Sequence, residues 1–472
     1  MKFSTHFKLR KSQAELDFVD IDPERDTRLF VDPYAIEIKD DDWSAGCGDH
    51  IRSFFQEVID ALRKGDDARA AQLISHLHEP PETFLGMSKG KPKGRGVGDE
   101  QGELILDALR KSAAVKTGVL SDLGEAELFV AGIGPDKLSD LTTNIIRGQL
   151  IKYTQSQCDL HGITIGNVAH GPTWNMAKSR WEGGYANLPV IGEKPILLVP
   201  KYSVRRRLSL DSQEFYNHHM INFLQCEYQS GASGLAQVFK GKVYKKDVKR
   251  VHPFIKDELA KFVDEHPEVL ERYKELKGQQ GALGNKDFDE DFDAETFAFT
   301  LKERLARCAT GDKSASEYHS LMIGILTFIF YPHLIWPIKE KEIHKGRKRV
   351  DILFTNSAQD GFFYRALVAA QTRSTHLPVE CKNYSYDIGN PELDQLSSRF
   401  GHHRGFLGIL TCRKDDRRAL TTERCRDTAQ DGRGFIIVLT DEDINKLLAF
   451  VGQNDQKAIS RFLQHRYEKL VL

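Results

Sequence analysis

Short apolar runs alternate with helical patterns over residues 294–472, and this alternation limits the possible folds more than any other feature of the chain. Strand-like runs lie near Leu334–Glu340 and at Arg349–Phe354, Gly405–Cys412 and Phe435–Thr440, with a strand or strand pair over Tyr364–Asn383. Helical patterns cover Ser314–Phe330, Asp416–Ala429 and Asp441–Phe450. Such alternation is typical of an α/β sheet covered by helices.

A further short helix is expected after the run Tyr364–Asn383. Asn390 is its expected N-cap, Pro391 lies in its first turn, and Leu393, Leu396 and Phe400 form its apolar face.

A glycine-rich and then acidic segment, Gly278–Asp293, is the best candidate for a domain boundary. The patterns before it are mostly helical, with one strand-like run at Lys194–Pro200; the helical patterns are Ile51–Arg63, Ala68–Leu77, Glu103–Ser112, Leu138–Ser156 and Pro253–Lys277. A Gly/Lys-rich stretch at residues 86–102 has no apolar periodicity and is expected to be a loop. We predict a mainly helical α+β region over residues 1–293, with a possible subdivision near 86–102, and a second domain over 294–472.

The net charge of -1 conceals an uneven distribution. Residues 301–472 contain 27 Lys and Arg against 21 Asp and Glu, whereas residues 1–300 contain 40 against 47. The C-terminal part is therefore mildly basic, which points weakly to an anionic partner for that part.

Three observations bear on the compartment. The seven cysteines lack any Cys-x-x-Cys pair, which is typical of free thiols in a reducing compartment. The first residues are too polar for a secretory signal. The uncharged stretch Tyr318–Ile338 is interrupted by Pro332, His333 and Pro337, which leaves too few apolar residues to cross a bilayer. We expect a cytoplasmic protein without a membrane segment.

Charged residues on two of the expected strands form the candidate site. Glu380 and Lys382 share one face of a strand, because alternate side chains point the same way, and Cys381 points to the other side. On the neighbouring run, Asp351 lies on the face opposite to Ile352. Two carboxylates can hold a hard cation through oxygen, and an ammonium beside them can act on the water and the phosphate. The alternative is a surface ion pair between these side chains.

Other Asp/Glu-x-Lys triplets occur in the chain. Glu37–Lys39 competes most closely, because its run alternates like a strand, but no helix precedes it and no strand–helix pattern follows it. We therefore favour Glu380–Lys382.

The sequence allows two roles for each of two further polar residues. Glu317 could supply a third oxygen to the site, or it could form a capping box with Ser314. Gln395, one turn before Arg399, could touch the lysine, the metal-bound waters or a phosphate, or it could be an ordinary exposed glutamine.

Basic residues flank the site in sequence. They are Arg347, Lys348 and Arg349 before the aspartate, and Arg399, His403 and Arg404 in and after the Gln395 helix. They could neutralise phosphates, or they could belong to solvated turns.

The order of a helix glutamate, Asp351, Glu380-Cys381-Lys382 and a helix with Gln395 resembles the PD-(D/E)XK or restriction-endonuclease-like superfamily over Ala294–Phe450. The resemblance implies a central mixed sheet flanked by helices and Mg²⁺-dependent cleavage of DNA, for which Mn²⁺ can substitute. It also implies that Asp351 and Glu380 bind the metal and that Lys382 positions or activates the water.

By the same resemblance Glu317 and Gln395 would be accessory. Val350 stands where many members have proline, and Arg399 stands where some have tyrosine. The superfamily often tolerates the first difference, and the second means that the glutamine–tyrosine helix signature of some members is absent.

The sequence therefore predicts a DNA endonuclease with an N-terminal recognition or regulatory region, open to a protein or ligand regulator. A homo-oligomer is expected, and a role in restriction or antiviral defence follows from the family analogy alone. The alternatives are an RNA-directed nuclease, a nucleic-acid-binding protein with an inactive nuclease fold, and an interaction scaffold.

Overall fold

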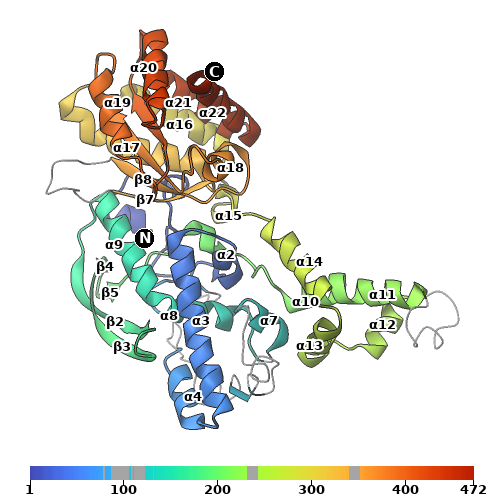
Figure 1. Cartoon of the computed structure of the whole chain (residues 1–472). Coiled ribbons are helices and arrows are strands. Elements are labelled where there is room, and N and C mark those ends of the chain that lie inside the picture. The colour runs from blue at the N-terminus through green and yellow to red at the C-terminus, as the bar shows by residue number, and fades with distance from the viewer. Residues whose placement is uncertain are drawn as a thin grey trace.

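The computed structural model describes residues 1–77, 80–86, 106–107, 110, 123–130, 132–230, 243–339 and 351–472. Figure 1 shows an N-terminal body, a C-terminal body above it, and a helical arm that projects to one side. The candidate site belongs to the C-terminal body.

A five-stranded mixed sheet forms the centre of the C-terminal body. Its strand order is β11-β10-β9-β8-β7. The strands are β7 (Leu334–Ile338), β8 (Ile352–Asn356), β9 (His376–Lys382), β10 (Leu407–Cys412) and β11 (Phe435–Thr440). Strands β9, β10 and β11 are parallel, whereas β7, β8 and β9 pair antiparallel. The predicted α/β architecture with a mixed sheet is confirmed.

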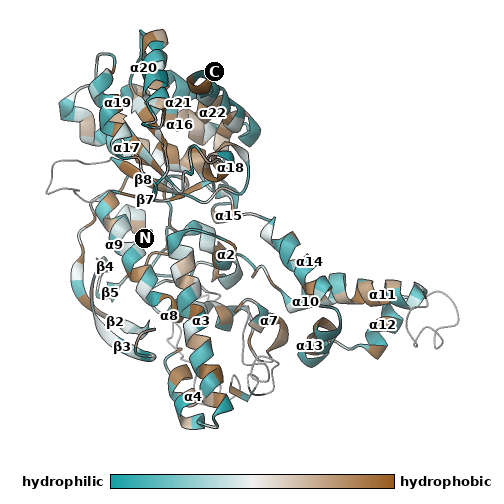
Figure 2. Cartoon of the chain, in the orientation of Figure 1, coloured by the Kyte–Doolittle hydropathy of each residue, from teal (hydrophilic) through white to brown (hydrophobic). Residues whose placement is uncertain are grey.

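Helices cover both faces of this sheet. They are α16 (Ala294–Arg307), η5 (Asp312–Ser314), α17 (Ala315–Phe330), α18 (Gly361–Val368), α19 (Asn390–Ser397), α20 (Arg418–Gln430), α21 (Asp441–Gly452) and α22 (Gln456–Val471). Ile409 packs with α16, α17 and α21 in one core, and Leu410 packs with α19 and α20 in the other. This division follows from the strand period of two. Figure 2 shows the apolar residues gathered in the central strands.

Three predictions within this body need correction. Strand β8 begins at Ile352, after Asp351, and extends two residues beyond Phe354. The first part of the predicted Tyr364–Asn383 strand belongs to helix α18, because its apolar residues continue a helix that starts at Gly361. The N-cap of α19 is Gly389, whose N–H donates to the Glu392 carboxylate (2.8 Å). The terminal helix α22 was not predicted.

The N-terminal body is mainly helical, with short strands and one long hairpin. Its elements are α1 (Phe3–His6), η1 (Gln13–Glu15), β1 (Phe30–Val31), α2 (Pro33–Glu37), α3 (Asp42–Arg63), α4 (Asp67–Ile74), α7 (Glu125–Phe129), α8 (Pro135–Ile145), α9 (Arg147–His161), β2 (Gly166–Asn175), β3 (Arg180–Leu188), β4 (Val190–Ile191), β5 (Lys194–Pro195), η2 (Lys201–Ser203) and β6 (Val204–Arg205). The predicted strand at Lys194–Pro200 is limited to its first two residues. The stretch before Lys39 is helical, so the competing Glu37–Lys39 triplet does not lie on a strand.

The arm consists of helical segments with a core of their own. Its described segments are α10 (Ser212–Glu214), the π-helix η3 (Phe215–Met220), α11 (Ile221–Ser230), α12 (Lys245–Val251), α13 (Lys256–Glu265) and α14 (Pro267–Gly278). Phe215, Phe262 and Tyr273 pack together in this core. A short helix, α15 (Asn285–Phe288), then leads back to the C-terminal body (Figure 1).

The N-terminal segment packs against helix α17. The Lys11 ammonium donates to the Ser320 carbonyl oxygen (2.6 Å), and Arg304 forms an ion pair with Glu15 (2.8 Å). Edge strand β7 joins the two bodies, because Leu334 lies in the C-terminal core and Ile335 in the N-terminal core. The division at residue 293 stays a prediction, and any separation there would have to break these contacts.

Candidate active site

The two candidate carboxylates meet at one end of strands β8 and β9. The register pairs Ile352 with Val379, so Asp351, one residue before β8, lies beside Glu380. The Cys381 N–H donates to Asp351 Oδ2 (2.6 Å), which fixes the aspartate against β9. The strand pairing therefore brings together the residues that the sequence pattern selected.

Glu380, Lys382 and Gln395 form a closed hydrogen-bonded triangle. The Lys382 ammonium donates to Glu380 Oε1 (2.7 Å) and to Gln395 Oε1 (3.0 Å). The Gln395 amide in turn donates to Glu380 Oε1 (2.5 Å). Gln395 is thus part of the site and not an ordinary surface residue, because α19 packs its apolar side on the sheet and turns this residue toward β9.

Glu380 is an acid in an unfavourable environment. Its side chain is 2% exposed, and among the described residues none donates a hydrogen bond to Oε2. Burial raises the pKa of Glu380 to about 7, and the nearby charge of Asp351 adds to this effect, whereas Lys382 and Arg399 oppose it. The unpaired oxygen and the neighbouring carboxylate both favour the arrival of a cation or a proton.

The Lys382 side chain stays cationic in this setting. Burial works to lower its pKa, but the charge and the hydrogen bond of Glu380 outweigh burial and raise the pKa above its ordinary value. The lysine is therefore an ammonium at neutral pH. It acts as a hydrogen-bond donor and a fixed positive charge.

Two positioning residues were missed by sequence reasoning. His319 Nε2, on helix α17, donates to the Asp351 carbonyl oxygen (3.0 Å). The buried Asn383 follows Lys382 directly, and its amide donates to the carbonyl oxygens of Ala309 and Gly311 (3.0 Å each). These contacts hold the two segments that carry the carboxylates. His319 lies in the polar first turns of α17, so no sequence signal identified it.

The structure excludes one of the two roles predicted for Glu317. Ser314 makes no side-chain hydrogen bond at the start of α17, so the proposed capping box is absent. Glu317 is exposed on the same helix as His319, and in the described part of the chain no hydrogen bond links it to Asp351 or Glu380. Its role as an accessory oxygen stays a prediction.

The basic residues occupy different places. Arg347, Lys348 and Arg349 lie outside the described residues. Arg399 is 4% exposed, and its charge acts on Glu380, so it lies within the site and not on the outer surface. The turn with His403 and Arg404 bonds to the start of β9, through Arg404 O and His376 N (3.0 Å). That is the opposite end of the strand from Glu380 and Lys382.

The residues present fit a divalent cation in their chemistry. Asp351 and Glu380 are hard oxygen donors, and one buried oxygen of Glu380 lacks a hydrogen-bond donor among the described residues. A search of the described chain for groups of three or more His, Cys, Asp or Glu side chains in a metal-holding arrangement found none. A cation here would thus rest on two carboxylates, with its remaining positions filled by water or substrate.

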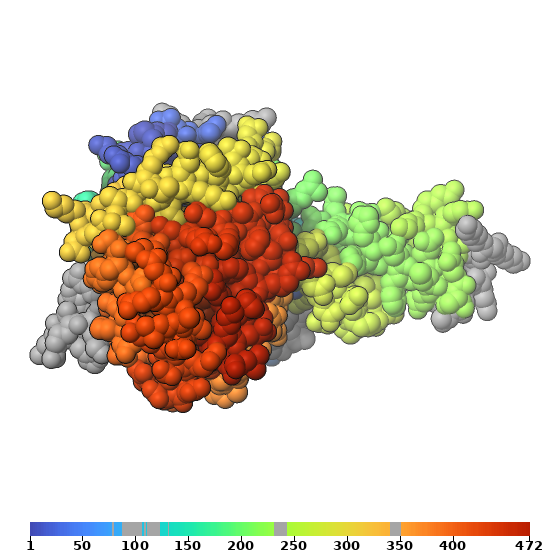
Figure 3. Space-filling model, turned by 90° about the horizontal axis from the view of Figure 1, so that it is seen from above, coloured from blue at the N-terminus to red at the C-terminus, as the bar shows by residue number. Residues whose placement is uncertain are grey.

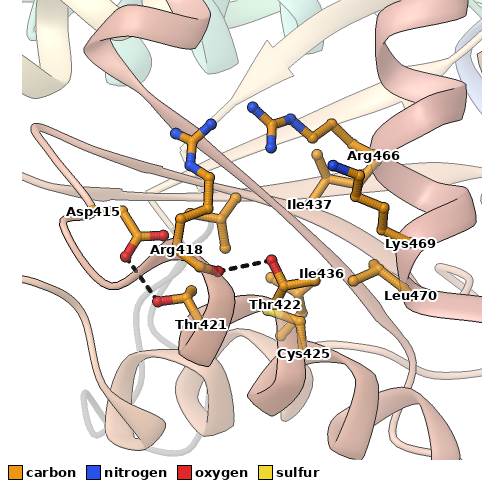
Figure 4. Close-up of a pocket in the computed structure, with 11 residues that line it drawn as sticks. Asp415, Arg418, Thr421, Thr422, Cys425, Ile436, Ile437, Arg466, Lys469 and Leu470 are labelled. Atoms are coloured by element: carbon orange, nitrogen blue, oxygen red, sulfur yellow. Dashed lines mark hydrogen bonds between the residues drawn. The ribbon is translucent and has the colours of Figure 1, made fainter.

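Two hollows elsewhere in the C-terminal body are distinct from this site. Figure 4 shows a cavity of about 30 Å³ beside α20 and α22, room for one water molecule. Its arginines, Arg418 and Arg466, both form ion pairs with the buried Asp443 (2.8 and 2.6 Å). A larger cavity of about 420 Å³ lies between α18, α22 and the last residues of α17. This cavity lies at the end of α17, whereas the candidate site lies beside His319 in the first turns of that helix.

No helix in the described ranges is long and apolar enough to cross a membrane, and all seven cysteines are free. A family model described as a domain of unknown function (DUF8370) matches residues 8–211. No curated protein and no solved structure matches the chain. The family match covers most of the N-terminal body and ends before the arm and the candidate active site.

Proposed function

We propose that the C-terminal body is a metal-dependent endonuclease that hydrolyses phosphodiester bonds of DNA. The observation that carries this proposal is the meeting of Asp351, Glu380 and Lys382 at one end of β8 and β9, with a buried carboxylate oxygen left unpaired. The mildly basic composition of residues 301–472 supports an anionic substrate. The PD-(D/E)XK resemblance and the mixed sheet agree with this assignment.

Each residue has a distinct task in the proposed reaction. Asp351 and Glu380 would hold the cation, which, when bound, supplies positive charge beside the phosphate and lowers the pKa of water. Lys382 remains an ammonium, so we assign it to orienting the attacking water and stabilising negative charge on the phosphate, and not to removing a proton. Without a cation, Glu380 Oε2 is the atom that takes up a proton as the pH falls below about 7.

Gln395 and His319 would be positioning residues. Gln395 bonds to both Glu380 and Lys382, so it fixes the distance between the carboxylate and the ammonium. His319 holds the backbone of Asp351. Loss of such supporting contacts typically lowers metal affinity or activity about 10–100-fold.

The test is cleavage of supercoiled plasmid by the full chain with Mg²⁺ or Mn²⁺, with and without chelator. Asp351→Ala and Glu380→Ala should abolish cutting, and Lys382→Ala should abolish it while metal binding persists. Gln395→Ala should cut about 10–100-fold more slowly. The matched control is Glu37→Ala, which removes the glutamate of the competing triplet from an exposed position and should cut at the wild-type rate.

Two results would contradict the proposal. Wild-type cutting by all of the site variants would show that the activity resides elsewhere. Tight DNA binding by a wild-type chain that never cuts would favour an inactive nuclease fold. Parallel reactions with single-stranded and duplex RNA decide between DNA and RNA as substrate. A role in restriction or antiviral defence, with control by residues 1–293, remains part of the proposal and rests on family analogy.

A further inference from the structure

Helix α12 on the arm concentrates positive charge on one face. Lys245, Lys246, Lys249 and Arg250 are all exposed, and at about 100° per residue they span an arc of roughly 140°. Val248, on the other side of the helix, is fully buried. The helix therefore presents a single cationic face, which we call the α12 basic face, to the solvent.

These charges are not matched within the described chain. Lys245, Lys246 and Arg250 form no ion pair with any described residue, and the Lys246 ammonium lies over the Tyr244 ring, 5.7 Å from its centroid. Lys245 lies one turn from Lys249, and Lys246 lies one turn from Arg250, so both pairs repel and weaken the helix. Stability of the arm does not account for this arrangement, whereas an anionic partner would relieve the repulsion.

The α12 basic face is rigidly mounted. The Lys249 ammonium donates to Asn217 Oδ1 of the π-helix (2.6 Å), and the Tyr216 hydroxyl donates to the His252 carbonyl oxygen (2.6 Å). The Gln225 amide donates to the Val243 carbonyl oxygen at the start of α12 (2.8 Å). Because the helix is held in place from both ends, little conformational entropy would be lost when a ligand binds.

The surroundings single out this face. The next helix, α13, carries four acidic residues, Asp257, Glu258, Asp264 and Glu265, and residues 1–300 are acidic as a whole. Helix α12 lies on the arm, which projects to one side of the two bodies (Figure 3). Two partly exposed aromatic residues lie near the basic face in sequence: Tyr244 is 52% exposed and sits under Lys246, and Phe254 is 41% exposed and packs on Tyr216.

We propose that the α12 basic face binds the phosphate backbone of duplex DNA. Ammonium and guanidinium groups in two rows are the groups that contact phosphates in sequence-independent binding, and exposed aromatic rings can pack on sugars. The choice of DNA rests on the proposed function of the C-terminal body, whereas the choice of an extended anionic polymer rests on the arm itself. The arm would hold the substrate at a second point and would not read its sequence.

The test measures binding of a short fluorescent DNA duplex to the full chain in chelator, across a range of salt concentrations. The variant is Lys245→Gln/Lys246→Gln/Arg250→Gln. Its affinity near 0.1 M salt should fall about tenfold or more, and the slope of log affinity against log salt should become less negative by about 2–3, since each lost phosphate contact removes about 0.9.

Two matched variants interpret that result. Lys178→Gln/Lys261→Gln/Arg272→Gln removes the same charge from exposed positions that already form ion pairs, and it should keep the wild-type slope. Lys245→Arg/Lys246→Arg/Arg250→Lys keeps the charge and should keep the affinity. A variant triple that binds DNA like its control would overturn the proposal. The proposal would also be overturned if the α12 variant lost binding to vesicles containing phosphatidylserine but kept its binding to DNA.

Failure of this inference is distinguishable from failure of the proposed function. If the wild-type chain binds DNA through α12 but never cuts plasmid, the nuclease proposal fails and the arm assignment stands. If the chain cuts plasmid and the α12 variant binds and cuts like its control, the nuclease proposal stands and the arm assignment fails.

Discussion

Burial gives Glu380 its unusual acid–base behaviour. The carboxyl group is shielded from water, lies beside Asp351, and receives hydrogen bonds from described residues on one of its two oxygens. A carboxylate in such a place costs folding free energy unless a cation or a proton neutralises it. The same features that suit Glu380 to hold a metal ion therefore make the metal-free protein sensitive to pH.

We predict that Glu380→Gln removes a pH dependence of stability. The pKa of Glu380 is about 7 in the folded chain against an ordinary value of 4.5, so the folded state holds the proton more tightly. The stabilising contribution is complete below pH 4.5 and is lost as the pH rises through 7, which amounts to about 3 kcal/mol. In chelator, the free energy of unfolding of wild type should therefore fall relative to Glu380→Gln over this window.

Urea denaturation from pH 4.5 to 8 measures this difference. Glu423→Gln, the same substitution at an exposed position on α20, should leave the pH profile of the wild type unchanged. Saturating Mg²⁺ should restore part of the lost stability of wild type above pH 7 and should not affect Glu380→Gln. Parallel profiles for all three proteins would show that the pKa of Glu380 is close to its ordinary value.

At the scale of elements, the turn before β10 depends on a glycine. Gly405 has a φ of +98°, and a Cβ there would lie 2.4 Å from Ser374 Cα and 2.7 Å from the Arg373 carbonyl oxygen. This close approach lets the turn after α19 bond to the start of β9, so the strands that carry the site enter the sheet in register. A side chain at this position fits only if the neighbouring backbone moves.

We predict that Gly405→Ala destabilises the protein by about 4 kcal/mol or more, because backbone strain and a clash add together. Gly432, before β11, also has a positive φ, of +71°, but no atom lies within 4 Å of its would-be Cβ. Gly432→Ala should thus cost only the conformational strain, about 1–2 kcal/mol. Chemical denaturation of both variants gives the comparison. Equal costs would mean that the close approach is not maintained in solution.

Helices and strands were predicted correctly where one local sequence pattern was enough to identify them. The run Phe435–Thr440 gave β11 with its bounds, because a buried parallel strand is continuously apolar. Helix α18 was read as strand, since a short apolar run does not distinguish the two. The hairpin β2–β3 was missed because most of its residues are exposed or half-exposed and show no apolar alternation.

The same limit applies to the candidate site. Glu380 and Lys382 share a strand face, so their spacing predicts their proximity, and the pairing of β8 with β9 adds Asp351. His319 and Asn383 bond to main-chain oxygens of segments far along the chain. Any residue type supplies such an oxygen, so no sequence pattern marks these contacts.

At the scale of the whole molecule, the two bodies share more than a linker. The Trp336 N–H, in β7, donates to Asp17 (3.1 Å), and the Gln157 amide donates to the Pro337 carbonyl oxygen (2.9 Å). With the contacts of Lys11 and Glu15 on α16 and α17, the N-terminal body covers the β7 edge of the sheet. The edge strand is thus protected from pairing with other chains.

We predict that residues 294–472, carrying Glu380→Ala, form a soluble domain that unfolds cooperatively at a lower temperature than the full chain with the same substitution. The main core of the sheet lies within this fragment, but Tyr331, Ile335 and Trp336 lose their cover. Calorimetry of both proteins tests this, and a synthetic peptide of residues 1–21 should raise the melting temperature of the fragment. An insoluble or unfolded fragment would show that the two bodies are one cooperative unit.

The packing of the first residues on α17 also has a consequence for protein synthesis. Lys11 leaves the ribosome well before its partner, Ser320, which lies 309 residues further along the chain. The segment with Lys11 and Glu15 must therefore wait in water until helices α16 and α17 have been made. A chain whose translation stops before α17 would carry this segment undocked, and the assembled sheet with its carboxylates would exist only in chains translated beyond β11.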